Sequence, residues 1–443
     1  MNSPETDATS SEPTPTELLS SYAVDGMVPG EVVLPDSIED VSRIMASASG
    51  EGRAVVPLGG GTMASLGNPP GTYDLALGTS SLAGVIYHEP ADLVASVQAG
   101  TIMAELRSVL AKGGQALPLD TPFPDQATIG GVIAAGYSGP SRLAFGEPRD
   151  WLIGIKVVTA DGRVSKAGGR VVKNVTGYDL CKLYSGSLGT LGIIVEAIFK
   201  VAPIADDHAT IIGAFERPGD AFQTAKSLLA LSYHPRSLQM IDGSLAAHLD
   251  EASLPAGRMA VLVRHSGRRS AVKRKVEDTI RILQGNHGEC SEIPHASEES
   301  LWQKLIDLDW SRDGGPDMVL RASTLPSQAQ GFWASFQDEA HPGLRQGMSV
   351  DPGMGIVKLY YWRDGEGAAP EGPDSAMLGV VQATRQKARG TGANLVIQRC
   401  PPSVKKHIDV WGEGLEGLEV MRRIKEQMDP KHTLSPGRFI GGL

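Results

Sequence analysis

Short apolar runs alternate with amphipathic stretches over the first half of the chain. Continuous runs predict strands at residues 31–34, 54–56, 74–77, 84–87 and 93–97. We expect Asp36 to cap a helix with Glu39, because apolar residues then recur at helical spacing at Ile38, Val41, Ile44 and Met45. A second helix after Thr101 is expected to end at Gly113. This alternation predicts an α/β unit with a glycine-rich loop after its second strand.

The pattern changes at about residue 206. Predicted strands and helices then follow one another in an order that occurs twice, without an internal sequence repeat. The strands are expected at residues 209–215, 237–241, 259–263, 318–322, 356–361 and 395–398, and the helices at residues 220–231, 270–283, 328–336 and 376–388. Antiparallel sheets with helices on one face, resembling a ferredoxin-like pair, are the simplest architecture for this order. A last amphipathic helix is predicted at residues 417–428.

Composition narrows the function classes. The 443 residues suggest two or three domains, and the formal net charge of −10 without a lysine or arginine run argues against a nucleic-acid partner. Cys181, Cys290 and Cys400 lie too far apart for a disulfide framework or an iron–sulfur cradle. No apolar run is long enough to insert into a membrane, and the N-terminus does not resemble a signal peptide. We therefore expect a cytoplasmic protein.

Three glycine-rich stretches carry the candidate chemistry. Residues 57–62 read Pro-Leu-Gly-Gly-Gly-Thr directly after a predicted strand, and a backbone without Cβ atoms can turn successive N–H groups toward a phosphate. A plain tight turn would use the same residues. Residues 127–139 and 182–194 are also rich in small residues, so another chain segment or a flat ligand must lie close to them.

These stretches together resemble the FAD-linked oxidases with the two-subdomain flavin fold of vanillyl-alcohol oxidase, also called the PCMH type. The resemblance rests on the triple glycine, on Thr128-Ile129-Gly130-Gly131, on the run from Lys182 to Gly192, and on Pro436-Gly437-Arg438. It implies an α+β protein with a PCMH-type FAD-binding domain at 28–205, a ferredoxin-like α+β cap domain at 206–400, and a C-terminal helix and tail at 401–443 that returns to the flavin. The first residues are rich in Ser, Thr, Pro and acidic residues, which predicts a disordered tail at residues 1–27.

Within the family, three segments resemble the FAD-binding E subunit of bacterial glycolate oxidase. They are residues 173–180, residues 409–412 and residues 436–442. This resemblance implies a sister FAD-linked subunit and an iron–sulfur subunit as partners, a small 2-hydroxy acid as substrate, and a position peripheral to the inner membrane through those partners. The scattered cysteines agree with an iron–sulfur cluster on a partner.

The resemblance also implies roles for single residues. The pyrophosphate of FAD would be held by Leu58, Gly59, Gly60, Gly61 and Thr62. The flavin and its chain would be lined by Pro118, Thr128, Gly130, Gly131, Ser138 and Gly139. The adenine end would be bordered by Gly189, Gly192, Ile193 and Ile194, and Arg438 would approach the isoalloxazine ring. Relatives that bind FAD covalently carry a histidine near the glycine loop, which this chain lacks, so non-covalent FAD is expected.

Oxidation of a 2-hydroxy acid by a flavin needs a cation for the carboxylate and a base for the hydroxyl proton. Arg321 and Arg399 are the candidate catalytic cations, with Lys358 as a further cation, and His407 and His432 are candidate bases. Surface ion pairs and solvated histidines are the alternative interpretations. Relatives that oxidise D-2-hydroxy acids carry a histidine-rich metal motif, and residues 351–355 match its place without a histidine, so no metal is expected.

Three functions remain open. The chain is a flavin subunit of a complex that oxidises glycolate to glyoxylate and passes electrons to an iron–sulfur partner, a stand-alone FAD-dependent D-2-hydroxy-acid dehydrogenase, or a flavin-binding assembly subunit with little turnover. A nicotinamide-binding Rossmann protein is a remote fourth, because Gly-x-Gly-x-x-Gly is not found after the first strand.

Overall fold

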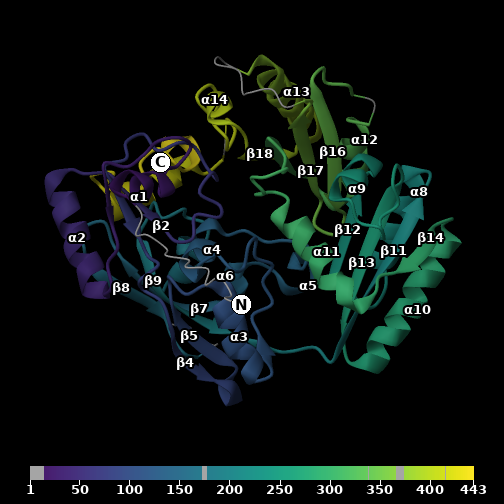
Figure 1. Ribbon diagram of the computed structural model, residues 1–443, viewed down its shortest axis with the longest axis horizontal. Coiled ribbons are helices and arrows are strands. Elements are labelled where there is room, and N and C mark those ends of the chain that lie inside the picture. The colour runs from purple at the N-terminus through teal and green to yellow at the C-terminus, as the bar shows by residue number, and fades with distance from the viewer. Residues whose placement is uncertain (1–13, 172–176, 338, 366–373, 415) are drawn as a thin grey trace, which may run out of the picture.

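The computed structural model describes residues 14–171, 177–337, 339–365, 374–414 and 416–443. Figure 1 shows two lobes side by side, and the C-terminal segment lies on the first of them. The first lobe is built from residues 14–206 and the C-terminal segment, and the cap lobe from residues 207–400. The E-subunit motif at residues 173–180 lies partly outside the described residues.

The first lobe begins with a small parallel sheet of order β1-β3-β2, whose strands are β1 (Glu31–Val33), β2 (Val55–Leu58) and β3 (Leu75–Gly78). Helix α2 (Ile38–Glu51) connects β1 and β2 and buries Val41 and Met45 against the sheet. The strands and helix match the prediction. Its cap is wrong by one position, because the hydroxyl of Ser37, rather than the carboxylate of Asp36, accepts the N–H of Asp40 at 3.1 Å.

A five-stranded antiparallel sheet of order β4-β5-β9-β7-β8 forms the rest of this lobe. Its strands are β4 (Val85–Glu89), β5 (Val94–Gln98), β7 (Leu152–Val158), β8 (Val164–Gly168) and β9 (Ile193–Lys200). Its apolar side packs on α3 (Met103–Lys112) and α4 (Ile129–Ala135). Thr101 does not cap α3 as predicted, because its hydroxyl is the acceptor for the N–H of Gly84 at 2.8 Å.

Short elements complete the first lobe. They are β6 (Gln115–Ala116) paired with β10 (Ala202–Pro203), the helices α5 (Arg142–Phe145), α6 (Pro148–Trp151) and α7 (Leu180–Tyr184), and the 3₁₀ turn η1 (Pro90–Asp92).

The cap lobe is one eight-stranded antiparallel sheet of order β14-β11-β13-β12-β16-β17-β15-β18. Its first half contains β11 (Asp207–Phe215), β12 (Ser237–Ile241), β13 (Met259–Gly267) and β14 (Glu289–Glu292), with α8 (Pro218–Leu229), α9 (Gly243–Leu249) and α10 (Arg269–Gly285). Its second half contains β15 (Met318–Ser323), β16 (Leu344–Asp351), β17 (Ile356–Arg363) and β18 (Asn394–Arg399), with α11 (His295–Asp307), η2 (Pro326–Gln328), α12 (Ala329–Ala334) and α13 (Ser375–Thr391).

Each half has the strand order of a ferredoxin-like unit, and β12 pairs with β16 to join the two edges. The predicted ferredoxin-like pair is therefore correct, and it merges into one sheet. Helices α8, α10, α12 and α13 cover one face. The predictions missed β16, because its residues that point away from this helical layer, Ser349 and Asp351 among them, are polar.

The prediction of a disordered tail at residues 1–27 is wrong for residues 14–27, and residues 1–13 lie outside the described part of the chain. Residues 15–21 form helix α1 (Pro15–Ser21), which Thr14 caps, and Val24 is fully buried. Asp25 is held by Lys405, whose Nζ lies 2.9 Å from each carboxylate oxygen. This ion pair orders a segment whose composition alone suggests disorder.

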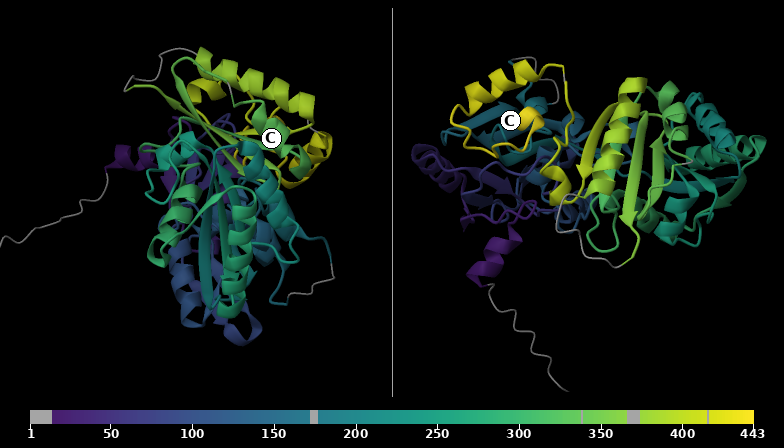
Figure 2. Two further views of the ribbon diagram at one scale, coloured as in Figure 1. Left: turned by 90° about the vertical axis from the view of Figure 1, so that its right-hand side faces the viewer. Right: turned by 90° about the horizontal axis from the view of Figure 1, so that it is seen from above.

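The C-terminal segment returns to the first lobe, as predicted. It contains α14 (Pro402–Lys405), α15 (Leu418–Met428) and the 3₁₀ turn η3 (Ile440–Gly442), and it lies across the first lobe in the right-hand view of Figure 2. The N–H of Val55 donates to the carbonyl of Thr433 at 2.7 Å, and the N–H of Ser435 donates to the carbonyl of Val55 at 2.8 Å. The tail thus pairs alongside β2, directly before the triple glycine. In the described part of the chain no helix is both long and apolar enough to cross a bilayer.

Candidate functional site

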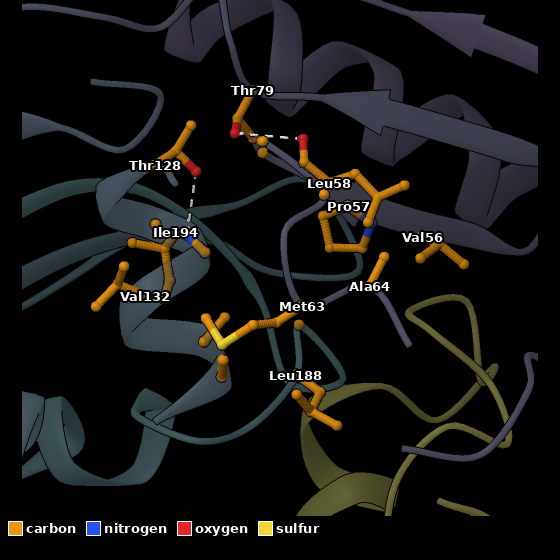
Figure 3. Close-up of a pocket in the computed structure, with 18 of the residues that line it drawn as sticks. Val56, Pro57, Leu58, Met63, Ala64, Thr79, Thr128, Val132, Leu188 and Ile194 are labelled. Atoms are coloured by element: carbon orange, nitrogen blue, oxygen red, sulfur yellow. Dashed lines mark hydrogen bonds between the residues drawn. The ribbon is translucent and has the colours of Figure 1, made fainter. Parts of the chain in front are cut away.

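The three glycine-rich stretches and the C-terminal tail meet around one cavity, which we call the inner cavity. Figure 3 shows its wall from Val56 to Ala64 opposite Thr128, Val132 and Ile194. Thirteen residues that the resemblance assigns to FAD line it: Leu58, Gly59, Gly60, Gly61, Thr62, Thr128, Gly130, Gly131, Gly189, Gly192, Ile193, Ile194 and Arg438.

The first two glycines of the loop are required by contact between protein segments. A Cβ on Gly59 would lie 1.9 Å from Oγ1 of Thr128, and a Cβ on Gly60 would lie 1.8 Å from the carbonyl oxygen of Gln126. Gly61 differs, because a Cβ there meets nothing within 4 Å while its φ of +67° lies in the left-handed region. The loop therefore lies directly against the second glycine-rich stretch.

The third stretch contacts the first and the tail. A Cβ on Gly189 would lie 2.6 Å from Cγ of Pro57, and the hydroxyl oxygen of Ser435 is the next neighbour at 3.7 Å. The buried Lys425 fixes this contact, because its Nζ donates to the carbonyl of Thr190 at 2.8 Å and to that of Leu434 at 2.9 Å. The close packing predicted for residues 182–194 thus holds the cavity wall together.

Arg438 carries the clearest chemical signal in the inner cavity. Its Nη2 donates to the carbonyls of Ala64 at 2.8 Å and Leu66 at 2.6 Å, while Nε and Nη1 are buried without a partner. Burial lowers the pKa of this guanidinium. Buried donors without partners destabilise a protein, so this lining suits a cofactor with acceptor groups.

A second cavity lies between the two lobes, and we call it the interlobe cavity. The first lobe contributes residues 135–140, Arg142 and Glu147, and the cap lobe contributes polar side chains from several strands of its sheet. Its volume is about 370 Å³. Ala135 lines both cavities, so a ligand in the inner cavity and one in the interlobe cavity would be neighbours.

The cap sheet places Arg321 and Lys358 next to each other. Arg321 of β15 pairs with Lys358 of β17, and Lys358 pairs in turn with Ser349 of β16. All three line the interlobe cavity. Arg321 donates to the hydroxyl of Ser323 at 3.0 Å, and no carboxylate pairs with it among the described residues. Burial lowers the pKa of the Arg321 guanidinium.

The ammonium of Lys358 is occupied by a buried partner. Its Nζ donates to a carboxylate oxygen of Asp309, which is fully buried. Asp309 also accepts the hydroxyls of Tyr137 and Tyr360, each at 3.1 Å, and burial raises the pKa of both phenols. Arg321 is thus the cation that remains available to a ligand carboxylate in this cluster.

Several other predicted site residues lie elsewhere. Ser138 and Gly139 line the interlobe cavity, and Pro118 lines neither cavity. Arg399 also lines neither cavity, and its guanidinium donates to the backbone carbonyl of Ser311.

The two candidate bases, His407 and His432, are exposed and line neither cavity. The polar residues of β16 were missed altogether. Their signal was present in the sequence as alternation from Met348 to Asp351, in which a polar residue follows each apolar one.

Several known proteins are similar to this chain in sequence. A family model described as an FAD binding domain matches residues 29–168. The chain is 30% identical to glycolate oxidase subunit GlcD of Bacillus subtilis (strain 168), covering 93% of this chain and 89% of that protein. It is 30% identical to D-lactate dehydrogenase of Archaeoglobus fulgidus, covering 99% and 97%. Glycolate oxidase subunit GlcE of Escherichia coli (strain K12) is 39% identical over 121 residues, which are 27% of this chain and 35% of that protein.

Solved structures share the fold at lower identity. p-Cresol methylhydroxylase with substrate bound superposes with a TM-score of 0.70 at 16% identity and covers 92% of this chain and 88% of that chain. The predicted PCMH-type fold is confirmed, and FAD is the cofactor. The position of each FAD-contacting residue stays a prediction.

Proposed function

The chain belongs to the family of FAD-linked oxidoreductases that act on 2-hydroxy acids, and from this premise we propose that it oxidises glycolate to glyoxylate as the FAD-binding subunit of a complex. FAD is held non-covalently in the inner cavity, and the 2-hydroxy acid binds in the interlobe cavity. The single observation that carries the proposal is the guanidinium of Arg321, which lines the interlobe cavity without a carboxylate partner.

A buried guanidinium without an anionic partner is energetically costly. The carboxylate of a 2-hydroxy acid can pair with Arg321, because the planar guanidinium donates two parallel hydrogen bonds to a carboxylate. The neighbouring Lys358 does not compete for this role, since Asp309 neutralises it. The substrate carboxylate is therefore oriented from β15, with its hydroxyl-bearing carbon left to face the first lobe.

The inner cavity suits non-covalent FAD for two reasons. Its glycine-rich lining keeps Cβ atoms away from the cofactor, and no histidine or cysteine occurs among its lining residues. Arg438 lines the same cavity, and its guanidinium carries two buried donors that have no protein partner. When bound, FAD supplies the two-electron acceptor that oxidation of an alcohol requires.

An iron–sulfur partner subunit and a sister FAD-linked subunit complete the proposal. The relatives named as glycolate oxidase subunits support a multi-subunit enzyme. Of the three cysteines of this chain, Cys181 and Cys400 are buried and Cys290 is partly buried.

We propose that electrons leave through the partner, which would place the complex in the cytoplasm at the inner membrane. Co-purification of the tagged chain with an iron–sulfur protein is the expected result, and full quinone-linked activity of the isolated chain would refute this part.

A stand-alone D-2-hydroxy-acid dehydrogenase is the second candidate. It is favoured by the similarity over nearly the whole length to an archaeal D-lactate dehydrogenase, and by the presence of both cavities in one chain. If D-lactate bleaches the flavin of the isolated chain, this candidate is favoured. If glycolate bleaches the flavin only when the partner subunits are present, the complex is favoured.

The deciding experiment is an anaerobic flavin spectrum of the purified chain, with and without partners, during titration with glycolate. Arg321→Met should raise the apparent dissociation constant for glycolate by about 10- to 100-fold, because a charge-assisted pair contributes about 1.5–3 kcal/mol. Arg399→Met is the matched control, since Arg399 lies outside both cavities, and it should bind glycolate as the unmodified chain does. Equal affinities for the two variants would refute the assignment of Arg321.

A further inference from the structure

The interlobe cavity holds a carboxyl group that the proposed function leaves unused. Asp351 is the last residue of β16, is 6% exposed, and lines the cavity together with Arg321 and Lys358. We propose that Asp351 is the catalytic residue that accepts the hydroxyl proton of the bound 2-hydroxy acid. This inference rests on the proposed function, and it assigns the base that this chain needs in place of a histidine.

The cap sheet points Asp351 into the cavity beside the carboxylate-binding residue. Ser349 pairs with Lys358, and Asp351 follows two positions later on the same face of β16. The N–H of Met354 donates to Oδ1 of Asp351 at 3.1 Å and fixes the carboxyl group at the strand end. Asp351 and Arg321 therefore lie on strands on either side of β17, and both line the interlobe cavity.

The surroundings of Asp351 suit a base that works near neutral pH. Three cations face the same space: Arg142 of α5, Lys358 of β17 and Arg321 of β15. Arg142 is paired with Glu147 at 2.7 Å and Lys358 with Asp309, so their charges are largely balanced. Burial therefore dominates and raises the pKa of Asp351 to about 6, within the range in which a general base is most effective.

The other acids near the cavity are already occupied. Asp309 is fully buried and binds Lys358, Tyr137 and Tyr360. Glu147 pairs with Arg142 at 2.7 Å and with Arg149 at 2.8 Å. Among the described residues that line this cavity, Asp351 is thus the carboxyl group without a basic side chain bound to it.

The hydroxyl O–H bond breaks and its proton passes to a carboxylate oxygen of Asp351, while the C–O bond becomes a carbonyl. Bound FAD would supply the two-electron acceptor for the α-hydrogen and its electron pair, so that the 2-hydroxy acid would become a 2-oxo acid. Arg321 keeps the carboxylate in place throughout.

The test compares Asp351→Asn with Asp242→Asn in the FAD-loaded chain and its partners. Asp242 is an ideal control because burial also raises its pKa to about 6, but it caps α9 and does not line the cavity. Three properties are measured for each variant: the dissociation constant for glycolate, the rate of anaerobic flavin bleaching, and the pH dependence of that rate from pH 5 to 8.

We expect Asp351→Asn to slow bleaching by about 100-fold or more, and to bind glycolate within about threefold of the unmodified chain, because general-base removal typically costs a factor of 10²–10⁴. The loss of rate below about pH 6 in the unmodified chain should disappear in Asp351→Asn and persist in Asp242→Asn.

Two outcomes overturn the inference separately. In the first, glycolate bleaches the flavin of the unmodified chain, and Asp351→Asn has the same bleaching rate and the same loss of rate at low pH. Asp351 is then not the base, and the proposed function still holds. Absence of bleaching in the unmodified chain with any 2-hydroxy acid, with or without partners, removes the proposed function and this inference with it.

Discussion

Gly59 and Thr128 lie in such close contact that a Cβ on Gly59 would fall 1.9 Å from the hydroxyl oxygen of Thr128. The two residues belong to separate glycine-rich stretches, and the contact joins the end of β2 to the start of α4. The absence of a side chain at residue 59 therefore serves the fold as well as the cofactor. Substitutions at different glycines of the inner cavity should separate these two roles.

We expect Gly59→Ala to destabilise the protein even without FAD, by about 1–3 kcal/mol, because the new methyl group must displace Thr128. Gly131→Ala should leave the apoprotein at least as stable, since its Cβ meets only Oγ1 of Thr128, at 3.2 Å, and alanine favours the helix. Gly131→Ala should nevertheless weaken FAD binding, because its methyl group enters the cavity. Thermal unfolding of the apoproteins measures the stability effect, and FAD titration measures the binding effect. An unchanged FAD affinity in Gly131→Ala would mean that the cofactor does not contact the start of α4.

Arg438→Met should weaken FAD binding by about 10- to 100-fold, because it removes a guanidinium that lines the inner cavity. Arg422→Met is the matched control, since Arg422 lies on the exposed side of α15. Fluorescence titration of the apoproteins gives both dissociation constants. If the two variants retain FAD equally, the C-terminal tail does not contact the cofactor through Arg438. Deletion from Ser435 onward should have a larger effect than Arg438→Met, because it also removes the pairing with Val55.

The buried carboxyl groups of Asp242 and Asp351 should make stability depend on pH. Burial raises the pKa of each from the usual 3.8 to about 6, so the folded state binds protons more tightly than the unfolded state. Stability is then greatest below about pH 4 for these groups and is lost as the pH rises to about 6.

Asp242→Asn should therefore stabilise the protein at pH 7.5 by about 1–2 kcal/mol, and this advantage should shrink toward pH 4. Urea unfolding of both proteins across this range measures the difference. A stability difference that does not change with pH would mean that Asp242 has the same pKa in the folded and unfolded states.

Lys405→Met should destabilise the protein by about 3–5 kcal/mol, because it leaves the carboxylate of Asp25 buried without its partner. The double variant Asp25→Asn with Lys405→Met should recover much of this loss, since neither charge is then buried alone. Urea midpoints of the two variants provide the comparison. Equal midpoints for the single and double variants would show that Asp25 does not need Lys405.

The sequence by itself determined the fold class and most of the inner cavity. Strands β2 and β3, helix α2 and the ferredoxin-like order of the cap lobe follow from local apolar periodicity, which depends on near neighbours alone. The glycine-rich stretches could be recognised for the same reason, because dense small residues limit what the backbone can do and what can lie against it. FAD as cofactor followed from the resemblance of these stretches, in this order, to those of the FAD-linked oxidases.

Only the tertiary structure decided which charged residues meet. Arg321 and Arg399 are equivalent candidates in the sequence, but Arg321 lines the interlobe cavity whereas Arg399 lies outside it and donates to Ser311. Asp351 became a candidate base because β16 enters the sheet between β12 and β17, a position that no local pattern specifies. Likewise, the ordered N-terminal segment depends on Lys405, which lies 380 residues away from Asp25. Contacts between distant residues depend on the whole fold, so the chemistry of the site emerges only when the chain is assembled.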